Sequence, residues 1–185
     1  MARTTRTDWL EQGLTLLVQQ GPTAVTIDSM CQLMKVTKGS FYHHFESQPV
    51  FLEALLQHWE EHYTTRFITE RLAGETAMEQ LQRLSAQVIE AHNTLEAIIR
   101  AWALTSPVAR SYQERVDARR LAYLQEVWMQ IVKDEQRAAT IANTMYSIVI
   151  GAQSMLPPVT TEGLTQIFSL LGQFFTQTSH EESSS

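Results

Sequence analysis

The sequence predicts an all-α protein, and three observations lead to that prediction. Apolar side chains recur at spacings of three and four residues in almost every segment of the chain. Glycine and proline fall mainly where these periodic segments break, as at Gly21-Pro22, Pro107 and Pro157-Pro158. Apolar and polar residues alternate over no more than a few positions, so half-buried β-strands are not expected.

Three short helices are expected in an N-terminal domain that covers residues 1–47. The first has one apolar face, formed by Leu10, Leu14, Leu17 and Val18. The second begins after Thr26, whose hydroxyl can cap it, and runs to Met34. A three-residue turn over 35–37 follows, and the third helix runs from a cap at Thr37 to about Phe45.

Longer helices are expected in a second domain that covers residues 48–178. Ser47 can cap a connecting helix over 48–73, with Pro49 tolerated in its first turn and Gly74 ending it. Further helices are predicted at 77–93, 95–105, 108–133, 135–156 and 162–177. The Ser-rich tail, residues 179–185, is expected to be disordered.

Composition and charge restrict the classes of function. The net charge of −6 argues against a protein that coats nucleic acid through bulk positive charge. Residues 1–50 nevertheless hold as many basic as acidic side chains, so the acidity lies further along the chain. Apolar runs are too short for a signal peptide or a membrane span, which favours a cytoplasmic location. The single cysteine, Cys31, has the helical spacing of a core residue.

Residues 26–45 carry the pattern with the most functional content. They predict two short helices joined by a tight turn, which is a helix-turn-helix, and the second helix has no acidic side chain. Phe41 and Phe45 lie one turn apart and would anchor it, while its outward face carries compact donors and acceptors that suit a major groove. The residues expected to contact DNA are Thr26, Thr37, Lys38, Gly39, Ser40, Tyr42, His43 and His44.

These contacts would divide between bases and phosphates. Lys38 can bond guanine acceptors or a phosphate, and Ser40 is short enough to let the helix approach the bases. Gly39 removes a side chain at the most exposed end of the helix. Thr26 and Thr37 stand at helix N-termini, where backbone amides favour an anion.

The same stretch resembles the DNA-binding domain of the TetR family. That domain has a helix-capping Thr, a short apolar helix, a turn like G-V-[ST]-x-G and an aromatic F-Y-x-H-F ending, and the match covers residues 6 to about 60. Two departures are visible: Lys35 stands where glycine is common in the turn, and Gln48 replaces a lysine that contacts a phosphate in many members. Arg3 and Arg6 on an N-terminal arm would compensate for the missing charge.

The resemblance implies a sequence-specific transcriptional repressor, not an enzyme, that binds double-stranded DNA as a homodimer without a cofactor. A palindromic operator needs two recognition helices about 34 to 36 Å apart. The resemblance also implies control by a small molecule in the second domain, as an inducer or a corepressor. The nearer alternative is an architectural DNA-binding protein that responds to no ligand.

The second domain offers candidates for the ligand and for the partner subunit. An apolar or aromatic effector would suit a cavity lined by Trp59, Tyr63, Phe67, Trp102, Tyr123 and Tyr146. Two apolar stripes on the last helices suit a four-helix bundle made by two copies, with Gly151 and Gly172 allowing close approach. The predicted interface residues are Ile141, Met145, Ile148, Val149, Ala152, Leu164, Ile167, Phe168, Leu171 and Phe175.

One short motif suggests a different class of function. His58-x-x-Glu61-His62 matches the H-x-x-E-H signature of zinc hydrolases, in which two histidines bind the metal and the glutamate activates water. A catalytic zinc needs a third protein ligand, and the sequence offers no evident one near this connecting helix. We therefore expect no metal site, and a zinc hydrolase is a remote alternative.

Overall fold

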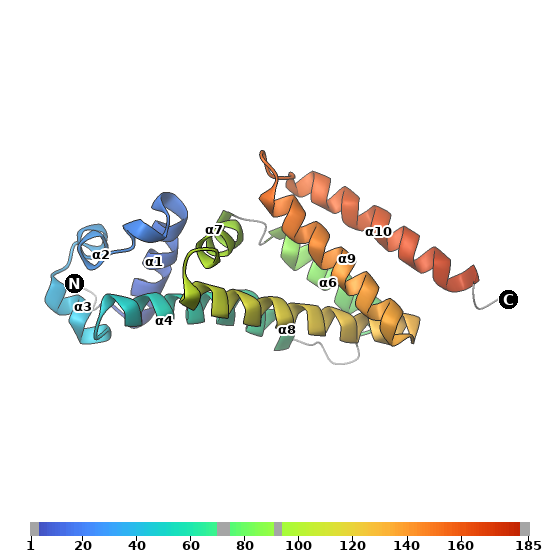
Figure 1. Ribbon diagram of the computed structural model, residues 1–185, viewed down its shortest axis with the longest axis horizontal. Helices are drawn as coiled ribbons and strands as arrows, with labels where there is room; N and C mark the ends of the chain where they lie inside the picture. The colour runs from blue at the N-terminus through green and yellow to red at the C-terminus, as the bar shows by residue number, and fades with distance from the viewer. Residues whose placement is uncertain (1–3, 70–74, 91–93, 182–185) are drawn as a thin grey trace. The chain divides into compact units, whose positions relative to one another are not determined.

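The computed structural model describes residues 4–69, 75–90 and 94–181, and within them it is helical with no β-strand (Figure 1). The all-α prediction is therefore confirmed. The helices in chain order are α1 (Arg6–Gln20), α2 (Ile27–Met34), α3 (Lys38–His44), α4 (Gln48–Glu60), α5 (Arg66–Thr69), α6 (Ala77–Glu90), α7 (Thr94–Ala103), α8 (Pro107–Val132), α9 (Glu135–Ser154) and α10 (Thr161–Glu181).

The chain packs as two compact units, each built from two segments. Unit 1 comprises Met1–Arg66 and Thr94–Asp117, and unit 2 comprises Phe67–Asn93 and Ala118–Ser185. The helix-turn-helix segment thus shares a unit with α4, α7 and the first part of α8. The predicted division at residue 47 falls inside unit 1 and remains a prediction about the division of function.

The start of the first helix differs from the expected arm. Thr5 and Asp8 form a reciprocal capping box: the Asp8 N–H donates to Thr5 Oγ1 at 3.2 Å and the Thr5 N–H to Asp8 Oδ2 at 2.7 Å. These hydrogen bonds from Thr5 lower the pKa of Asp8. Arg6 is consequently the first residue of α1, and its guanidinium lies 5.1 Å from the centre of the Phe45 ring. The prediction that Arg6 lies on an N-terminal arm was wrong, and Arg3 lies outside the described residues.

An aromatic core holds the helices of unit 1 together. Trp9 of α1 and Phe41 of α3 meet edge to face with ring centroids 5.4 Å apart, and Phe41 packs on Phe51 of α4 at 5.5 Å. Val18, expected in the core, is exposed instead, and Leu16 is buried. The close approach of α1 to α4 depends on Gly13, because a Cβ there would lie 2.9 Å from side-chain atoms of both Phe51 and Leu55.

Unit 2 has its own apolar core between α6, α8, α9 and α10, and Figure 1 shows α6, α9 and α10 running beside one another. Trp128 of α8 is buried there and its indole N–H donates to the Met145 sulfur of α9 at 3.2 Å. The buried residues of this core are Leu81, Tyr123, Val127, Trp128, Ala138, Ile141, Ala142 and Met145.

The predicted connecting helix is not a continuous α-helix. After α4, the segment Glu61–Thr65 forms a π-helical turn, in which the Arg66 N–H bonds to the Glu61 carbonyl, and α5 follows. The predicted end of this helix at Gly74 lies outside the described residues. At the other end of the chain, α10 continues to Glu181, into the tail predicted as disordered, and 182–185 lie outside the described residues.

Among the helices in the described part of the chain, none combines the length and the apolar character that crossing a bilayer requires.

Candidate nucleic-acid interface

The turn between α2 and α3 is built from local hydrogen bonds. Thr26 caps α2 as predicted, because its Oγ1 accepts the Ser29 N–H at 3.1 Å. At the other end Lys35 adopts the left-handed conformation, with φ of 56°, and the Val36 N–H donates to the Cys31 carbonyl at 3.0 Å. Glycine adopts this conformation without a Cβ clash, which explains why glycine is common at this position in the family that the segment resembles.

Helix α3 is held in place by aromatic packing and not by a side-chain cap. Thr37 occupies the N-cap position, but its side chain makes no capping hydrogen bond, so the predicted side-chain cap is absent. Phe41 is fully buried among the rings of Trp9, Phe45 and Phe51. These contacts hold α3 against α1 and α4 and leave its opposite face directed outward.

Most of the predicted DNA-contacting residues are exposed on this outward face. Tyr42 is 55% exposed, and Thr37, Lys38, Gly39 and His43 are exposed as well. A large aromatic side chain that stays exposed on a short helix is unusual for a solvent surface.

Three predicted contact residues are less accessible than the others. Thr26 and Ser40 are half-buried, and so is His44, whose ring lies 6.5 Å from that of Trp9. His44 thus contributes packing to α3 in addition to any contact with DNA.

Lys38 is held by an ion pair that the sequence did not reveal. Its ammonium lies 2.6 Å from Asp28 Oδ1 across the turn, and both side chains are largely exposed. The hydrogen bond and charge of Asp28 raise the pKa of Lys38. Exposed pairs of this kind are weak, so the contact can exchange for a phosphate or a guanine.

Gln48 has a structural role at the start of α4. Its Nε2 donates to the Val25 carbonyl at 2.9 Å, which ties α4 to the segment that precedes α2. Ser47 caps α4 as predicted, accepting the Val50 N–H at 3.4 Å. The residue that replaces the family's phosphate-binding lysine therefore stabilises the arrangement of the helix-turn-helix instead.

No family model and no curated protein matches the sequence, yet solved structures match the fold over most of its length. A transcriptional regulator from Rhodococcus sp. Rha1 has a TM-score of 0.75 at 14% identity and covers 95% of this chain and 97% of that chain. A TetR-family regulator from Marinobacter aquaeolei VT8 gives 0.67 at 15% identity, with 90% and 89% covered. The ketosteroid transcriptional regulator of Mycobacterium tuberculosis gives 0.66 at 19%, with 92% and 94% covered. The chain has the fold of TetR-family transcriptional regulators.

Within this TetR fold, the aromatic residues predicted to line one effector cavity divide between two cores. Trp59, Tyr63 and Trp102 belong to the core of unit 1, and Tyr123 belongs to that of unit 2. Tyr146 is buried on α9, whereas the side chain of Phe67 lies outside the description. The described contacts therefore do not bring the set together around one site.

Two polar contacts at the end of α4 were not predicted from the sequence. The indole N–H of Trp59 donates to Glu96 Oε1 of α7 at 3.1 Å, with both side chains buried. Glu60 accepts the Nε–H of Arg115 of α8 at 2.9 Å. Glu96 is a polar residue within an apolar segment, which is a signal that could have found it, whereas Glu60 stands in a polar stretch and has no such signal. The two contacts fix the end of α4 to two later helices of the TetR fold.

Part of the predicted dimer interface is buried within its own chain. Ile141, Met145, Ala152 and Leu164 are all buried within this chain, which leaves little of their surface for a partner, and the predicted interface stays a prediction. Apolar periodicity marks the face that is covered but not what covers it. The other predicted interface residues that the description covers, Ile148, Val149, Ile167, Phe168 and Leu171, are half-buried, and the side chain of Phe175 lies outside it.

The possible zinc signature lacks the rest of a metal site. The rings of His58 and His62 lie with centroids 4.0 Å apart, and His62 Nδ1 lies 3.0 Å from the His58 carbonyl oxygen. Burial, with a smaller effect from His62, lowers the pKa of His58. Within the described residues no group of three potential ligands gathers, so nothing in the geometry favours a zinc hydrolase.

Proposed function

We propose that this protein is a dimeric, sequence-specific transcriptional repressor whose α3 helix reads the major groove of a palindromic operator and whose affinity for DNA is set by a small molecule. The observation that carries the proposal is the face of α3. It exposes Tyr42, His43 and Lys38 without an acidic neighbour on the helix, while Phe41 anchors the opposite face. The fold shared with TetR-family regulators supports the same reading.

Each residue of the interface has a role that its position suggests. We assign contacts with base edges or the nearest phosphates to Ser40, Tyr42 and Lys38, which all belong to α3. Thr26 and Thr37 are the N-cap residues of α2 and α3, and we assign to them contacts with DNA phosphates, because amide groups at a helix N-terminus favour an anion. His43 and His44 extend the reach of α3 by donating to phosphates.

Two alanine variants test the recognition helix. Tyr42→Ala and Lys38→Ala are each expected to abolish binding to a duplex selected from random DNA, because both side chains are exposed on α3. Lys133→Ala, which removes an exposed lysine from unit 2, is the matched control and should bind normally. Fluorescence anisotropy gives the affinities, and wild-type binding by the two α3 variants would refute the assignment.

The proposed dimer uses an exposed stripe on α10. Leu170 and Phe174 are 67% and 63% exposed, and with the half-buried Ile167 and Leu171 they follow the spacing of one helical face. Cβ atoms added at Gly151 and Gly172 would meet nothing within 4 Å in this chain, which leaves room for the close approach of a second copy. Such an exposed apolar face is the kind that a symmetric bundle covers.

A charge placed in that stripe tests the dimer. Leu170→Glu should give a folded monomer that binds DNA poorly, because the buried carboxylate would be unpaired at the interface. Leu104→Glu, at a residue 75% exposed in unit 1, is the control and should stay dimeric. Sedimentation velocity measures the mass, and an unchanged dimer in the Leu170 variant would show that the interface lies elsewhere.

Ligand control is proposed to act through α4. Trp59 and Glu60 tie the end of this helix to α7 and α8, and the π-helical turn follows directly. A ligand that binds the operator-competent and the incompetent arrangement equally would change nothing, so the effector must prefer one of them. Either induction or corepression satisfies this condition. Glu60→Gln should change how strongly an effector alters DNA affinity while DNA binding itself is retained.

A further inference from the structure

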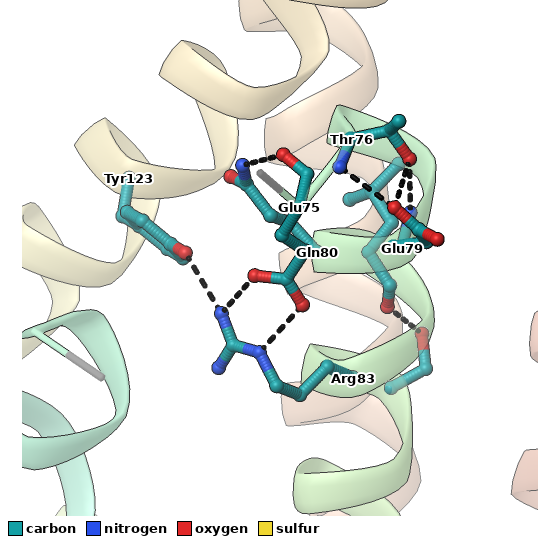
Figure 2. Close-up of polar contacts among 8 residues, drawn as sticks. Glu75, Thr76, Glu79, Gln80, Arg83 and Tyr123 are labelled. Carbon is teal, nitrogen blue, oxygen red and sulfur yellow. Dashed lines mark hydrogen bonds and ion pairs between the residues drawn. The ribbon is translucent and has the colours of Figure 1, made fainter. Parts of the chain in front are cut away.

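A buried ion pair stands at the start of α6, inside unit 2. Arg83 donates from Nε to Glu75 Oε1 at 2.9 Å and from Nη2 to Oε2 at 3.2 Å, and the Glu75 side chain is only 6% exposed. Figure 2 shows this fork together with the capping box in which Thr76 and Glu79 begin the helix. The bond to Glu75 raises the pKa of Arg83, so the guanidinium stays charged and its charge is neutralised in place.

The same helix face leaves buried polar atoms without a partner in the described part of the chain. They are Arg83 Nη1, Gln80 Oε1 and Gln87 Oε1. The three residues follow the spacing of one face of α6, and Gln80 is only 6% exposed. In Figure 2 the side chains of Gln80 and Arg83 both extend from α6 toward Tyr123 of α8. Buried polar groups normally have partners, because leaving them unpaired is costly.

The chemistry of these unpartnered atoms defines which hydrogen-bonding groups a partner would have to supply. Arg83 Nη1 has two N–H donors to offer and needs an oxygen acceptor. Gln80 must present its oxygen, because its Nε2 already donates to the Glu75 carbonyl at 3.3 Å and a reversed amide would place two acceptors together. This face of α6 therefore offers donors from Arg83 and an acceptor from Gln80, and the Arg83–Glu75 pair leaves no net charge to balance.

We propose that this face of α6 binds the polar end of an uncharged small molecule, which presents an oxygen acceptor to Arg83 and a hydroxyl or amide donor to Gln80. The inference rests on the proposed ligand control and names the class of effector. An anion would meet the buried Glu75 carboxylate, and a cation would meet the Arg83 guanidinium, so each is disfavoured. The apolar part of the molecule would pack on neighbouring core side chains such as Leu81 and Trp128.

A matched set of probes tests the charge and the hydrogen-bonding pattern. Benzamide carries an acceptor and donors without charge, benzoate carries acceptors and a negative charge, benzamidinium carries donors and a positive charge, and toluene carries neither. We expect benzamide to bind unit 2 of the full-length protein at least about fivefold more tightly than the other three. Titrations followed by NMR of glutamine and arginine side-chain N–H signals give the affinities. Tightest binding by an ion, equal binding by toluene, or no binding by benzamide up to its solubility limit would each overturn the proposal.

Two glutamine variants separate a ligand contact from a structural one. Gln80→Met and Gln87→Met each remove an unpartnered oxygen, so both should weaken benzamide binding about tenfold. Gln87→Met should leave Tm unchanged or higher, whereas Gln80→Met also loses the Nε2–H bond to the Glu75 carbonyl and should lower Tm. Gln82→Met, at an exposed position of the same helix, should change neither quantity. A fall in Tm with unchanged benzamide affinity in both variants would contradict the proposal. If Gln80→Met does not fold, Gln87→Met alone decides the question.

DNA binding measured on the same preparations distinguishes this inference from the proposed function. Normal DNA binding by a protein that fails the benzamide test overturns the ligand class and leaves the repressor assignment intact. Selective benzamide binding by a protein that shows no preference for any DNA sequence overturns the repressor assignment and leaves the α6 site intact.

Discussion

Replacing Lys35 by glycine should stabilise the protein. Lys35 ends α2 with φ of 56° and ψ of 44°, a left-handed conformation in which a Cβ approaches the following carbonyl. The hydrogen bond that closes the C-terminus of α2 is formed, since the Val36 N–H donates to the Cys31 carbonyl at 3.0 Å. Removing the Cβ therefore relieves strain without costing a hydrogen bond.

The expected size of the effect follows from two opposing terms. A non-glycine residue in the left-handed region costs about 1 to 2 kcal/mol. Glycine gives back about 0.4 to 1 kcal/mol because it makes the unfolded chain more flexible. Lys35→Gly should thus raise the free energy of unfolding by about 0.5 to 1 kcal/mol.

Urea denaturation of a short series of variants measures this effect. We expect the order Gly, then Asn, then Ala and Lys, because Asn tolerates the left-handed region and Ala keeps the Cβ while removing the charge. Lys133, with φ of 54°, offers an independent site in unit 2 where glycine should act in the same direction. A stabilisation by Lys35→Ala equal to that by Lys35→Gly would show that charge, and not backbone strain, governs this position.

Three further predictions follow from single contacts. Asp28→Asn should tighten DNA binding about fivefold in anisotropy titrations, because it releases Lys38 and removes a negative charge beside the DNA backbone. No gain over wild type would count against phosphate or base contact by Lys38. Gly13→Ala should lower the free energy of unfolding by about 1 to 2 kcal/mol in urea, since the clash with Phe51 outweighs the better helix propensity of alanine; a stabilised variant would contradict the close approach. Because burial lowers the pKa of His58, the native state resists protonation, and stability should fall more between about pH 7 and pH 5 in the wild type than in His58→Gln. Parallel profiles of stability against pH for the two proteins would contradict the claim that the native state resists protonation of His58.

Local periodicity accounts for how well the helices could be predicted. The segment predicted at 77–93 is helical over Ala77–Glu90, and the one predicted at 108–133 is helical over Pro107–Val132. The breaks predicted at Gly21 and Pro107 coincide with the end of α1 and the start of α8. The interruption of the connecting helix at Glu61–Thr65 has no comparable signal, because a π-helical turn needs no particular residue.

Which element covers an apolar face could not be predicted from the sequence. Leu164 and Leu170 both belong to apolar stripes of α10, yet Leu164 is fully buried in its own chain and Leu170 is exposed. Only the packing of α10 on α6 and the rest of unit 2 decides between them. The same limit explains why Val18 was placed in the core and Leu16 was not.

Polar contacts between distant residues were the other part that the sequence did not reveal. Gln48 was interpreted as a missing phosphate contact, and the structure shows it bonded to the Val25 carbonyl. Asp28 and Lys38 lie on separate helices that meet only once the turn has formed. Arg83 and Gln80 do have a visible signal, since polar residues at helical spacing interrupt the apolar face of α6.

The most direct test of the account compares two DNA duplexes. A duplex selected from random sequences and a scrambled duplex of the same composition are titrated with the wild type and with Tyr42→Ala, at one fixed salt concentration. If α3 reads an operator, the wild type prefers the selected duplex by a factor of about 10³ or more, and Tyr42→Ala loses this preference. Equal binding of both duplexes by the wild type, or an undiminished preference in Tyr42→Ala, would contradict the claim that α3 reads an operator.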